Sequence, residues 1–367
     1  MKFICTQENL KKGLNNTTHL AGRNQNLPIL NNVLLETKNG VLTISSTNLE
    51  IGIKSAVRGK VEEDGSLTVP ARLFFEYVQN TKAEKIELTT KGLNLEIKTE
   101  NSHTTLKGLD YSEFPLIPEI EKKYKIEMTA GEIKEALALI LFATALDNAR
   151  PEISGVLFDF NENGLTLAAT DSYRLAEKSL KVSEKIDFSK KIIIPSFTLQ
   201  ELSRLVGDID KKNIVKMYLN DNQVAYEIDT TTMISRITEG EYPDYKQIIP
   251  QNSKTEALVN RQQLHQSIKA ASLFCRQGIN DINLVFLKDK IEIKALNDQL
   301  GESQNAVQVE LEGEENEIVF NYHYLLDVLG SLNGEFVKIK INNNSLPGII
   351  KPQDREDYLY IIMPIKQ

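Results

Sequence analysis

An internal repeat constrains the fold of this chain more than any other feature. A block beginning at Pro28 (PILNNVLLETKNGVLTISSTNLEIGIKSAV) is matched by a block beginning at Pro151 (PEISGVLFDFNENGLTLAATDSYRLAEKSL), which lies 123 residues further on. In both blocks, apolar and polar residues alternate on either side of an Asn-Gly pair. This pattern predicts two antiparallel strands joined by a tight turn. The chain is therefore expected to contain at least two similar domains.

Helical patterns extend the repeat to three copies. Apolar residues at four-residue spacing predict a helix after a short strand at residues 10–14, 133–137 and 264–268. Thr129 with Glu132 forms a capping box for the second of these helices, and Asn260 is the expected N-cap of the third.

A second helix is predicted in each copy, from TVPARLFFEYVQN, IIIPSFTLQELSRLVG and VFNYHYLLDVLGSL. Each copy then returns to alternating strands and ends at Phe114-Pro115, Tyr242-Pro243 or Met363-Pro364. The order of elements predicts three similar α+β domains, each with two helices packed on antiparallel sheets. Their expected bounds are residues 1–120, 126–248 and 253–367.

Six helices per chain limit the ring that such domains can build. With helices about 9 Å apart, six would leave a hole of only about 7 Å, whereas twelve from two chains would leave about 24 Å. The larger hole admits a nucleic-acid duplex about 20 Å across. A homodimeric ring is therefore predicted if the polar helix faces point inward.

The polar helix faces carry recurring cations. Lys11, Lys12, Arg72, Lys134, Arg204, Arg261 and Lys269 lie on them, with Arg23 and Arg150 just beyond helix ends. Any one of these is most simply an ordinary solvated position, and only the recurrence on equivalent faces is informative. Glu8, Glu76, Glu135 and Glu201 lie on the same helices, so the expected surface is only mildly positive.

Composition restricts the remaining function classes. A net charge of -8 argues against wholesale polyanion binding but leaves room for a local basic surface. The two cysteines, Cys5 and Cys275, have no disulfide or zinc spacing, and no stretch approaches a membrane span. We therefore expect a cytoplasmic protein with no metal and no cofactor.

An enzyme is the main alternative, because Thr170-Asp171-Ser172-Tyr173-Arg174 places an acid, a hydroxyl and a guanidinium close together. The four histidines are scattered, however, and no Gly-rich phosphate loop is present. Asp171 is more simply a turn residue that accepts backbone hydrogen bonds. A repeat scaffold that binds only proteins is a second alternative, which composition alone does not separate from a DNA ring.

Several motifs together resemble the bacterial sliding clamp, the beta subunit of DNA polymerase III. They are GRNQNLPILNNVLLE, TVPARLFFE, ATDSYRLA, EGEYPDYKQIIP, VFNYHYLLDVL and the terminal MPIKQ. The resemblance implies a head-to-tail homodimeric ring that encircles duplex DNA, is loaded by a clamp loader, and tethers polymerase without catalytic activity of its own. Implied partners are the DNA polymerase III alpha subunit, the clamp loader, and other polymerases and repair factors that bind through linear peptide motifs.

The resemblance also implies site residues. DNA contacts carry over to Arg23 and Arg72, and to the matching positions Asp147, Pro151 and Glu152. A partner-peptide pocket between domains 2 and 3 carries over to Ile153, Thr170, Ser172, Tyr173, Arg174, Leu175, Pro243, Gln247, Ile248, Asn321, Tyr324, Leu346, Gly348, Met363, Pro364, Ile365 and Lys366. Tyr173, Gln247 and Lys366-Gln367 stand where the family frequently has His, Arg and Arg-Leu.

The residues themselves permit two interpretations of this pocket. Ile153, Leu175, Ile248 and Met363 could form an apolar hole for a leucine or aromatic anchor, with Arg174 and Tyr324 as polar edges. Alternatively, the first three are plain core residues, and Asn321 merely caps the helix that begins at Tyr322.

Overall fold

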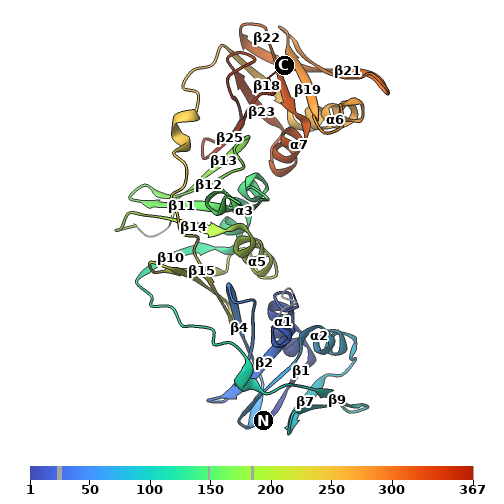
Figure 1. Ribbon diagram of the computed structural model, residues 1–367, viewed down its shortest axis with the longest axis vertical. Helices are drawn as coiled ribbons and strands as arrows, with labels where there is room; N and C mark the ends of the chain where they lie inside the picture. Colours follow the sequence, from blue (N-terminus) through green and yellow to red (C-terminus); the bar gives the residue numbers. More distant parts are fainter. Residues whose placement is uncertain (23–26, 148, 183–185, 367) are drawn as a thin grey trace. The chain divides into compact units, whose positions relative to one another are not determined.

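The computed structural model describes residues 1–22, 27–147, 149–182 and 186–366, which form two compact units (Figure 1). Unit 1 comprises Met1–Gly131 and Glu201–Ile237, and unit 2 comprises Glu132–Gln200 and Thr238–Gln367. Helices α3 (Ala130–Ile140) and α5 (Ser196–Gly207) contribute residues to both units. In the described part of the chain, no helix combines the length and apolarity that a membrane span requires.

Unit 1 contains two antiparallel sheets. The five-stranded sheet has the order β5 (Lys60–Glu63), β1 (Lys2–Thr6), β7 (Lys85–Lys91), β8 (Asn94–Lys98) and β9 (His103–Lys107). The eight-stranded sheet has the order β10 (Tyr124–Thr129), β15 (Ile214–Leu219), β16 (Gln223–Ile228), β17 (Thr231–Arg236), β4 (Ile51–Val57), β3 (Val41–Thr47), β2 (Asn32–Lys38) and β6 (Gly65–Pro70). The pairing of β4 with β17, which joins strands of two repeats, is called the first seam below.

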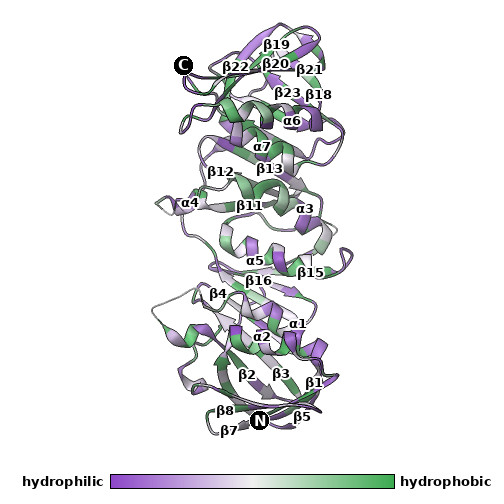
Figure 2. Ribbon diagram, turned by 90° about the vertical axis from the view of Figure 1, so that its right-hand side faces the viewer, coloured by the Kyte–Doolittle hydropathy of each residue, from purple (hydrophilic) through white to green (hydrophobic). Residues whose placement is uncertain are grey.

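Helices α1 (Gln7–Thr18) and α2 (Ala71–Asn80) lie side by side in unit 1 (Figure 1). The side chain of Thr6 begins α1 by accepting a hydrogen bond from the backbone N of Asn9. Leu10 and Leu14 are fully buried in the same core as Phe74, as the four-residue spacing predicted. Most of α1 is hydrophilic (Figure 2), and Leu10 and Leu14 place its apolar side chains on one face, which leaves the other face polar.

Unit 2 contains one antiparallel sheet of twelve strands. Its order is β14 (Lys190–Pro195), β11 (Gly155–Asn161), β12 (Gly164–Thr170), β13 (Arg174–Leu180), β25 (Tyr358–Ile362), β24 (Gly348–Pro352), β23 (Phe336–Ile341), β18 (Thr255–Asn260), β21 (Gly301–Gly313), β20 (Lys290–Asn297), β19 (Asp281–Phe286) and β22 (Asn316–Asn321). The long strand β21 pairs with β20 along its first part and with β18 along its last part. The pairing of β13 with β25 again joins two repeats and is called the second seam.

Three helices lie entirely in unit 2: α4 (Pro151–Ser154), α6 (Arg261–Ala271) and α7 (Tyr322–Ser331). The caps of α6 and α7 are confirmed, because Asn260 accepts hydrogen bonds from the first turn of α6 and Asn321 accepts one from the backbone N of His323. Short 3-10 turns occur at Pro28–Asn31, Tyr111–Glu113, Leu141–Ala143, Tyr245–Ile248 and Ser272–Phe274.

Candidate functional site

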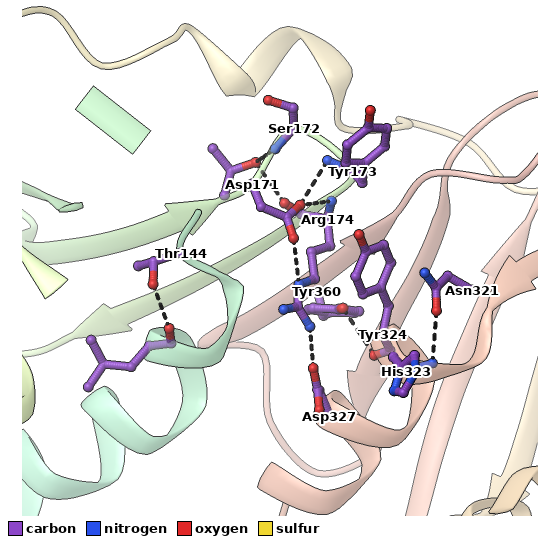
Figure 3. A network of polar contacts seen from close by, with 12 residues as sticks. Thr144, Asp171, Ser172, Tyr173, Arg174, Asn321, His323, Tyr324, Asp327 and Tyr360 are labelled. Carbon is purple, nitrogen blue, oxygen red and sulfur yellow. Dashed lines mark hydrogen bonds and ion pairs between the residues drawn. The ribbon is translucent and has the colours of Figure 1, made fainter. Parts of the chain in front are cut away.

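The loop before β13 is held in one conformation by its own polar side chains (Figure 3). The carboxylate of Asp171 accepts hydrogen bonds from the backbone N of Tyr173 at 2.9 Å and of Arg174 at 3.0 Å. The hydroxyl of Thr170 donates to the carbonyl of Arg174 at 2.6 Å. Ser172 has a φ of +81°, which turns the chain sharply. Asp171 therefore has the turn role that the sequence favoured, and Tyr173 is left 63% exposed.

Strand register places an apolar row across the second seam. Leu175 pairs with Ile361, and the backbone N of Met363 donates to the carbonyl of Tyr173 at 2.8 Å. Because side chains alternate along a strand, Tyr173, Leu175, Ile361 and Met363 share one face of the sheet. Leu175 and Ile361 are buried in a cluster with Tyr245, whereas Met363 is half-buried. The row thus has a buried floor and an accessible end.

The segment after β17 covers the floor of this row. Tyr245 is buried there, and its hydroxyl donates to the carboxylate of Glu177. The pKa of Tyr245 is raised, mainly because the hydroxyl is buried and secondly because of this hydrogen bond. Pro243 and Gln247 are exposed, and Ile248 is 44% exposed.

The loop before β24 supplies another accessible apolar side chain, Leu346, which is 46% exposed. Leu346 lies two residues before Gly348, which pairs with Ile362 of β25. A β-carbon at Gly348 would lie 2.7 Å from Cζ of Phe320, so only glycine fits there without displacement. This close packing brings the loop to the edge of the second seam.

Arg174 lies on the opposite face of β13 and is anchored on several sides (Figure 3). Its Nε donates to Asp171 Oδ2 at 2.9 Å, its Nη1 pairs with Asp327, and its guanidinium lies 4.5 Å from the Tyr324 ring centre. Burial disfavours the charge, but the hydrogen bond to Asp327 and the nearby carboxylates raise the pKa of Arg174. Arg174 thus stabilises the loop before β13 from the face of the sheet opposite the apolar row.

The remaining predicted pocket residues divide by exposure. Ile153 is only 2% exposed, and Thr170 is buried. The interpretation as plain core residues therefore holds for Ile153 and Leu175, but not for Ile248, which is exposed. The backbone N of Ile365 donates to the carbonyl of Val319 at 2.8 Å, which ties the C-terminal segment to β22. Pro364 is half-buried and Lys366 is exposed.

Sequence reasoning missed three residues that shape this region. Tyr245 and Ile361 belong to the buried floor, and the alternation of apolar residues in β25 was a usable signal for Ile361. Asp327 had no comparable signal, because it lies 153 residues from its partner Arg174.

Of the predicted DNA contacts that the structure describes, Arg72, Asp147 and Pro151 are exposed and Glu152 is half-buried. Arg72 is exposed on α2 and pairs with Glu76 at 2.8 Å, a hydrogen bond that raises the pKa of Arg72. Asp147 is exposed and accepts a hydrogen bond from the backbone N of Ala149. Pro151 and Glu152 open α4. Arg23 lies outside the described residues.

Three of the six other cations predicted on the helix faces are engaged within their own unit. Lys12 pairs with Asp229 at 2.7 Å, and Arg204 contacts Glu201 and the last carbonyls of α1. Arg261 donates to the carbonyls of Leu329 and Gly334, and so caps the end of α7. Within the described ranges, Lys11, Lys134 and Lys269 make no side-chain ion pair. The helix faces therefore offer fewer free cations than their composition indicated.

The fold and the sequence matches define the class of protein. Residues 1–118, 127–244 and 246–366 match, in this order, the N-terminal, central and C-terminal domains of the DNA polymerase III beta subunit. The beta sliding clamps of Bacillus subtilis (strain 168) and Chlamydia pneumoniae are 28% and 27% identical over 378 and 367 residues, and each match covers 100% of this chain and at least 99% of the relative.

Solved structures agree with these matches. The Bacillus subtilis sliding clamp has a TM-score of 0.95 at 28% identity, covering 100% of this chain and 99% of that one. The Pseudomonas aeruginosa sliding clamp bound to griselimycin has a TM-score of 0.95 at 27% identity, covering 100% of both chains.

These matches assign the molecule first to the α+β clamps of DNA replication. The chain belongs to the DNA polymerase III beta subunit family, the beta sliding clamps. It is accordingly a processivity factor, a polymerase subunit without catalytic activity of its own.

Proposed function

We propose that two copies of this chain form a head-to-tail ring around duplex DNA in the cytoplasm. Each copy would contribute domains at residues 1–120, 126–248 and 253–367. In this proposal the ring slides on DNA of any sequence and holds the DNA polymerase III alpha subunit, the clamp loader, other polymerases and repair factors by short peptide motifs.

Two incompletely paired strands support the head-to-tail junction. Strand β9 is the edge of its sheet, and the part of β21 that pairs with β20 has no second neighbour among the described strands. The unpaired N–H and C=O groups at such edges can form hydrogen bonds with a strand of another chain. Leu273, Leu296 and Leu300, which are 73%, 61% and 65% exposed, would supply apolar area beside β21. Joining β9 of one copy to β21 of the next is a heterologous contact, which two copies could close into a ring.

The state of the cations supports topological rather than tight DNA binding. Because Lys12, Arg204 and Arg261 are engaged internally, direct affinity for a short linear duplex should be weak and sensitive to salt. Lys11, Lys134 and Lys269 remain available for phosphate contacts, which carry no sequence information.

The observation that carries the partner proposal is the apolar row at the second seam. Its floor of Leu175 and Ile361 is buried, and its end at Tyr173 and Met363 is accessible. We name the surface formed by Tyr173, Met363, Ile248 and Leu346 the partner groove. A leucine or phenylalanine anchor of a partner peptide would pack there, and a few such anchors commonly dominate binding. The likeness to a clamp solved with a bound ligand is consistent with this use.

Deletion of Met363 to Gln367 tests the partner groove. A buried anchor contact typically contributes about 2 kcal/mol or more, so a leucine-anchored polymerase peptide should bind at least about thirtyfold more weakly in calorimetry. Leu93→Ala, in the exposed turn after β7, is the matched control and should leave affinity unchanged. Sedimentation of the same samples should report the dimer for all three proteins. Unchanged peptide affinity in the folded deletion variant would refute the groove.

A further inference from the structure

A hollow with a volume of about 490 Å³ lies in unit 1 at the first seam. Leu49, Glu50, Gly52, Leu116, Ile117 and Arg236 are among the residues that line it. Leu116 is 97% exposed and Leu49 is 47% exposed, so apolar surface remains uncovered at this place.

The hollow occupies the repeat position of the partner groove. Strand β4 corresponds to β13 at the 123-residue offset, and Leu49 and Ser172 share an unusual positive φ of +77° and +81°. In the two seams, Ser55 pairs with Thr231 and Lys178 with Tyr358. This register makes Arg236 the equivalent of Met363, and Glu50 the equivalent of Tyr173.

The floor of the hollow is built differently from that of the partner groove. Gly52 stands where the second seam has Leu175, and a β-carbon there would lie 2.5 Å from Cγ2 of Ile117. Ile117 therefore fills the space that a leucine side chain takes in the other repeat. The backbone of this segment is held in place because Lys54 Nζ donates to the carbonyl of Ile117 at 3.2 Å.

The rim of the hollow is charged, unlike that of the partner groove. Glu50 and Arg236 are both exposed and face each other across the seam, where the backbone N of Arg236 donates to the carbonyl of Glu50 at 3.2 Å. In the part of the chain that the structure describes, neither side chain makes an ion pair. The rim thus presents one unpaired anion and one unpaired cation beside exposed leucine side chains.

We propose that this hollow is a second peptide-docking groove, which takes an extended segment with an aliphatic anchor next to an acid and a base. The anchor packs against Leu49, Leu116 and Ile117, while the acid pairs with Arg236 and the base pairs with Glu50. Because Glu50 immediately precedes β4 and Arg236 ends β17, an extended segment across the seam meets them one after the other, and the groove discriminates between the two orders of acid and base. This site goes beyond the proposed function, which uses only the partner groove.

Two peptides of identical composition test the proposal in the full-length protein. One is acetyl-Gly-Leu-Leu-Asp-Ser-Lys-amide, and in the other Asp and Lys are exchanged. Fluorescence anisotropy should show that one order binds about fivefold more tightly, the size expected from two solvent-exposed ion pairs. The double variant Glu50→Lys/Arg236→Glu should invert that preference, and Leu116→Ala should weaken both peptides.

Deletion of Met363 to Gln367 separates the two grooves. The order preference should persist in this variant, because the first seam is untouched. Equal affinity for both orders, absence of binding, or a preference that the charge exchange fails to invert would overturn the proposal. Loss of the preference in the deletion variant would also overturn it, since binding would then belong to the partner groove. Circular dichroism of each variant confirms that the exposed substitutions leave the fold intact.

Discussion

The two seams use the same three repeat positions with different chemistry. At the first seam, Asn16 Nδ2 donates to Thr231 Oγ1 at 2.9 Å, and Ser55 lies 2.9 Å from the same hydroxyl. All three side chains are buried and neutral. At the 123-residue offset, Asn16 and Ser55 correspond to Leu139 and Lys178, and the strand register makes Tyr358 the equivalent of Thr231.

The second seam fills these positions with a charge and an aromatic ring. The hydroxyl of Tyr358 donates to the carbonyl of Leu139 at 3.1 Å. The side chain of Lys178 is only 3% exposed and pairs with Asp357, which also binds Arg355. One backbone plan thus accommodates either a neutral hydrogen-bonded cluster or a buried lysine paired with a half-exposed carboxylate. Loss of one partner should therefore destabilise the two seams by different amounts. A buried charge without a partner costs more folding free energy than a buried hydroxyl without one.

The largest effect is expected from Asp357→Asn. The substitution leaves the ammonium of Lys178 buried without a carboxylate, which should destabilise unit 2 by about 3 kcal/mol. Hydrogen exchange at the amides of β13 and β25 measures this locally. Asp354→Asn, at an exposed neighbour, is the control and should change stability by less than about 0.5 kcal/mol. Equal protection in both variants would show that the buried pair contributes nothing to the seam.

A smaller effect is expected from Thr231→Val at the first seam. Removing the hydroxyl leaves Asn16 and Ser55 with one partner fewer each, which should cost about 1 to 2 kcal/mol in unit 1. Thr232→Val, on the neighbouring half-buried position, is the control. Exchange protection of β4 and β17 reports the difference. The comparison between the seams would fail if Thr231→Val cost more than Asp357→Asn.

The smallest effect on stability is expected when the pH is lowered. The hydrogen bond to Arg355, and then the pairing with Lys178, lower the pKa of Asp357 to about 2. Because this pKa lies below the unfolded value of about 3.9, the stabilisation is complete above pH 4 and is lost as the pH falls toward 2. At pH 3 only part of this stabilisation is lost, and solvent screening reduces it further because Asp357 is 41% exposed, so the loss at that pH should stay below about 1 kcal/mol. Exchange protection of β25 should fall over this range, and in Asp357→Asn this component of the fall should be absent.

Local sequence patterns predicted the elements of the fold because short-range physics determines them. Four-residue apolar spacing located α1 and α6, Asn260 was correctly predicted to cap its helix, and the alternative interpretation of Asn321 as a cap is confirmed. The turn role of Asp171 is likewise confirmed by its contacts within three residues. These features depend on neighbours along the chain.

Local patterns could not predict which side chains pair with partners far away in the sequence. Lys178 occupies a polar position in an alternating strand, and only its partner 179 residues away explains its burial. Lys12 similarly pairs with Asp229 across 217 residues, and no local pattern indicated this partner. For the partner groove, alternation predicted that Leu175 was apolar but gave no indication that Tyr245 would cover it.

Retention on circular DNA tests the central claim, a ring that holds DNA by topology. The protein would be loaded by its clamp loader onto a singly nicked circular duplex and separated from free protein by gel filtration at high salt. We predict that it stays with the circle and is released when one cut linearises the DNA. Release from the circle at the same rate as from the linear form, or retention on linear DNA with free ends, would contradict the account.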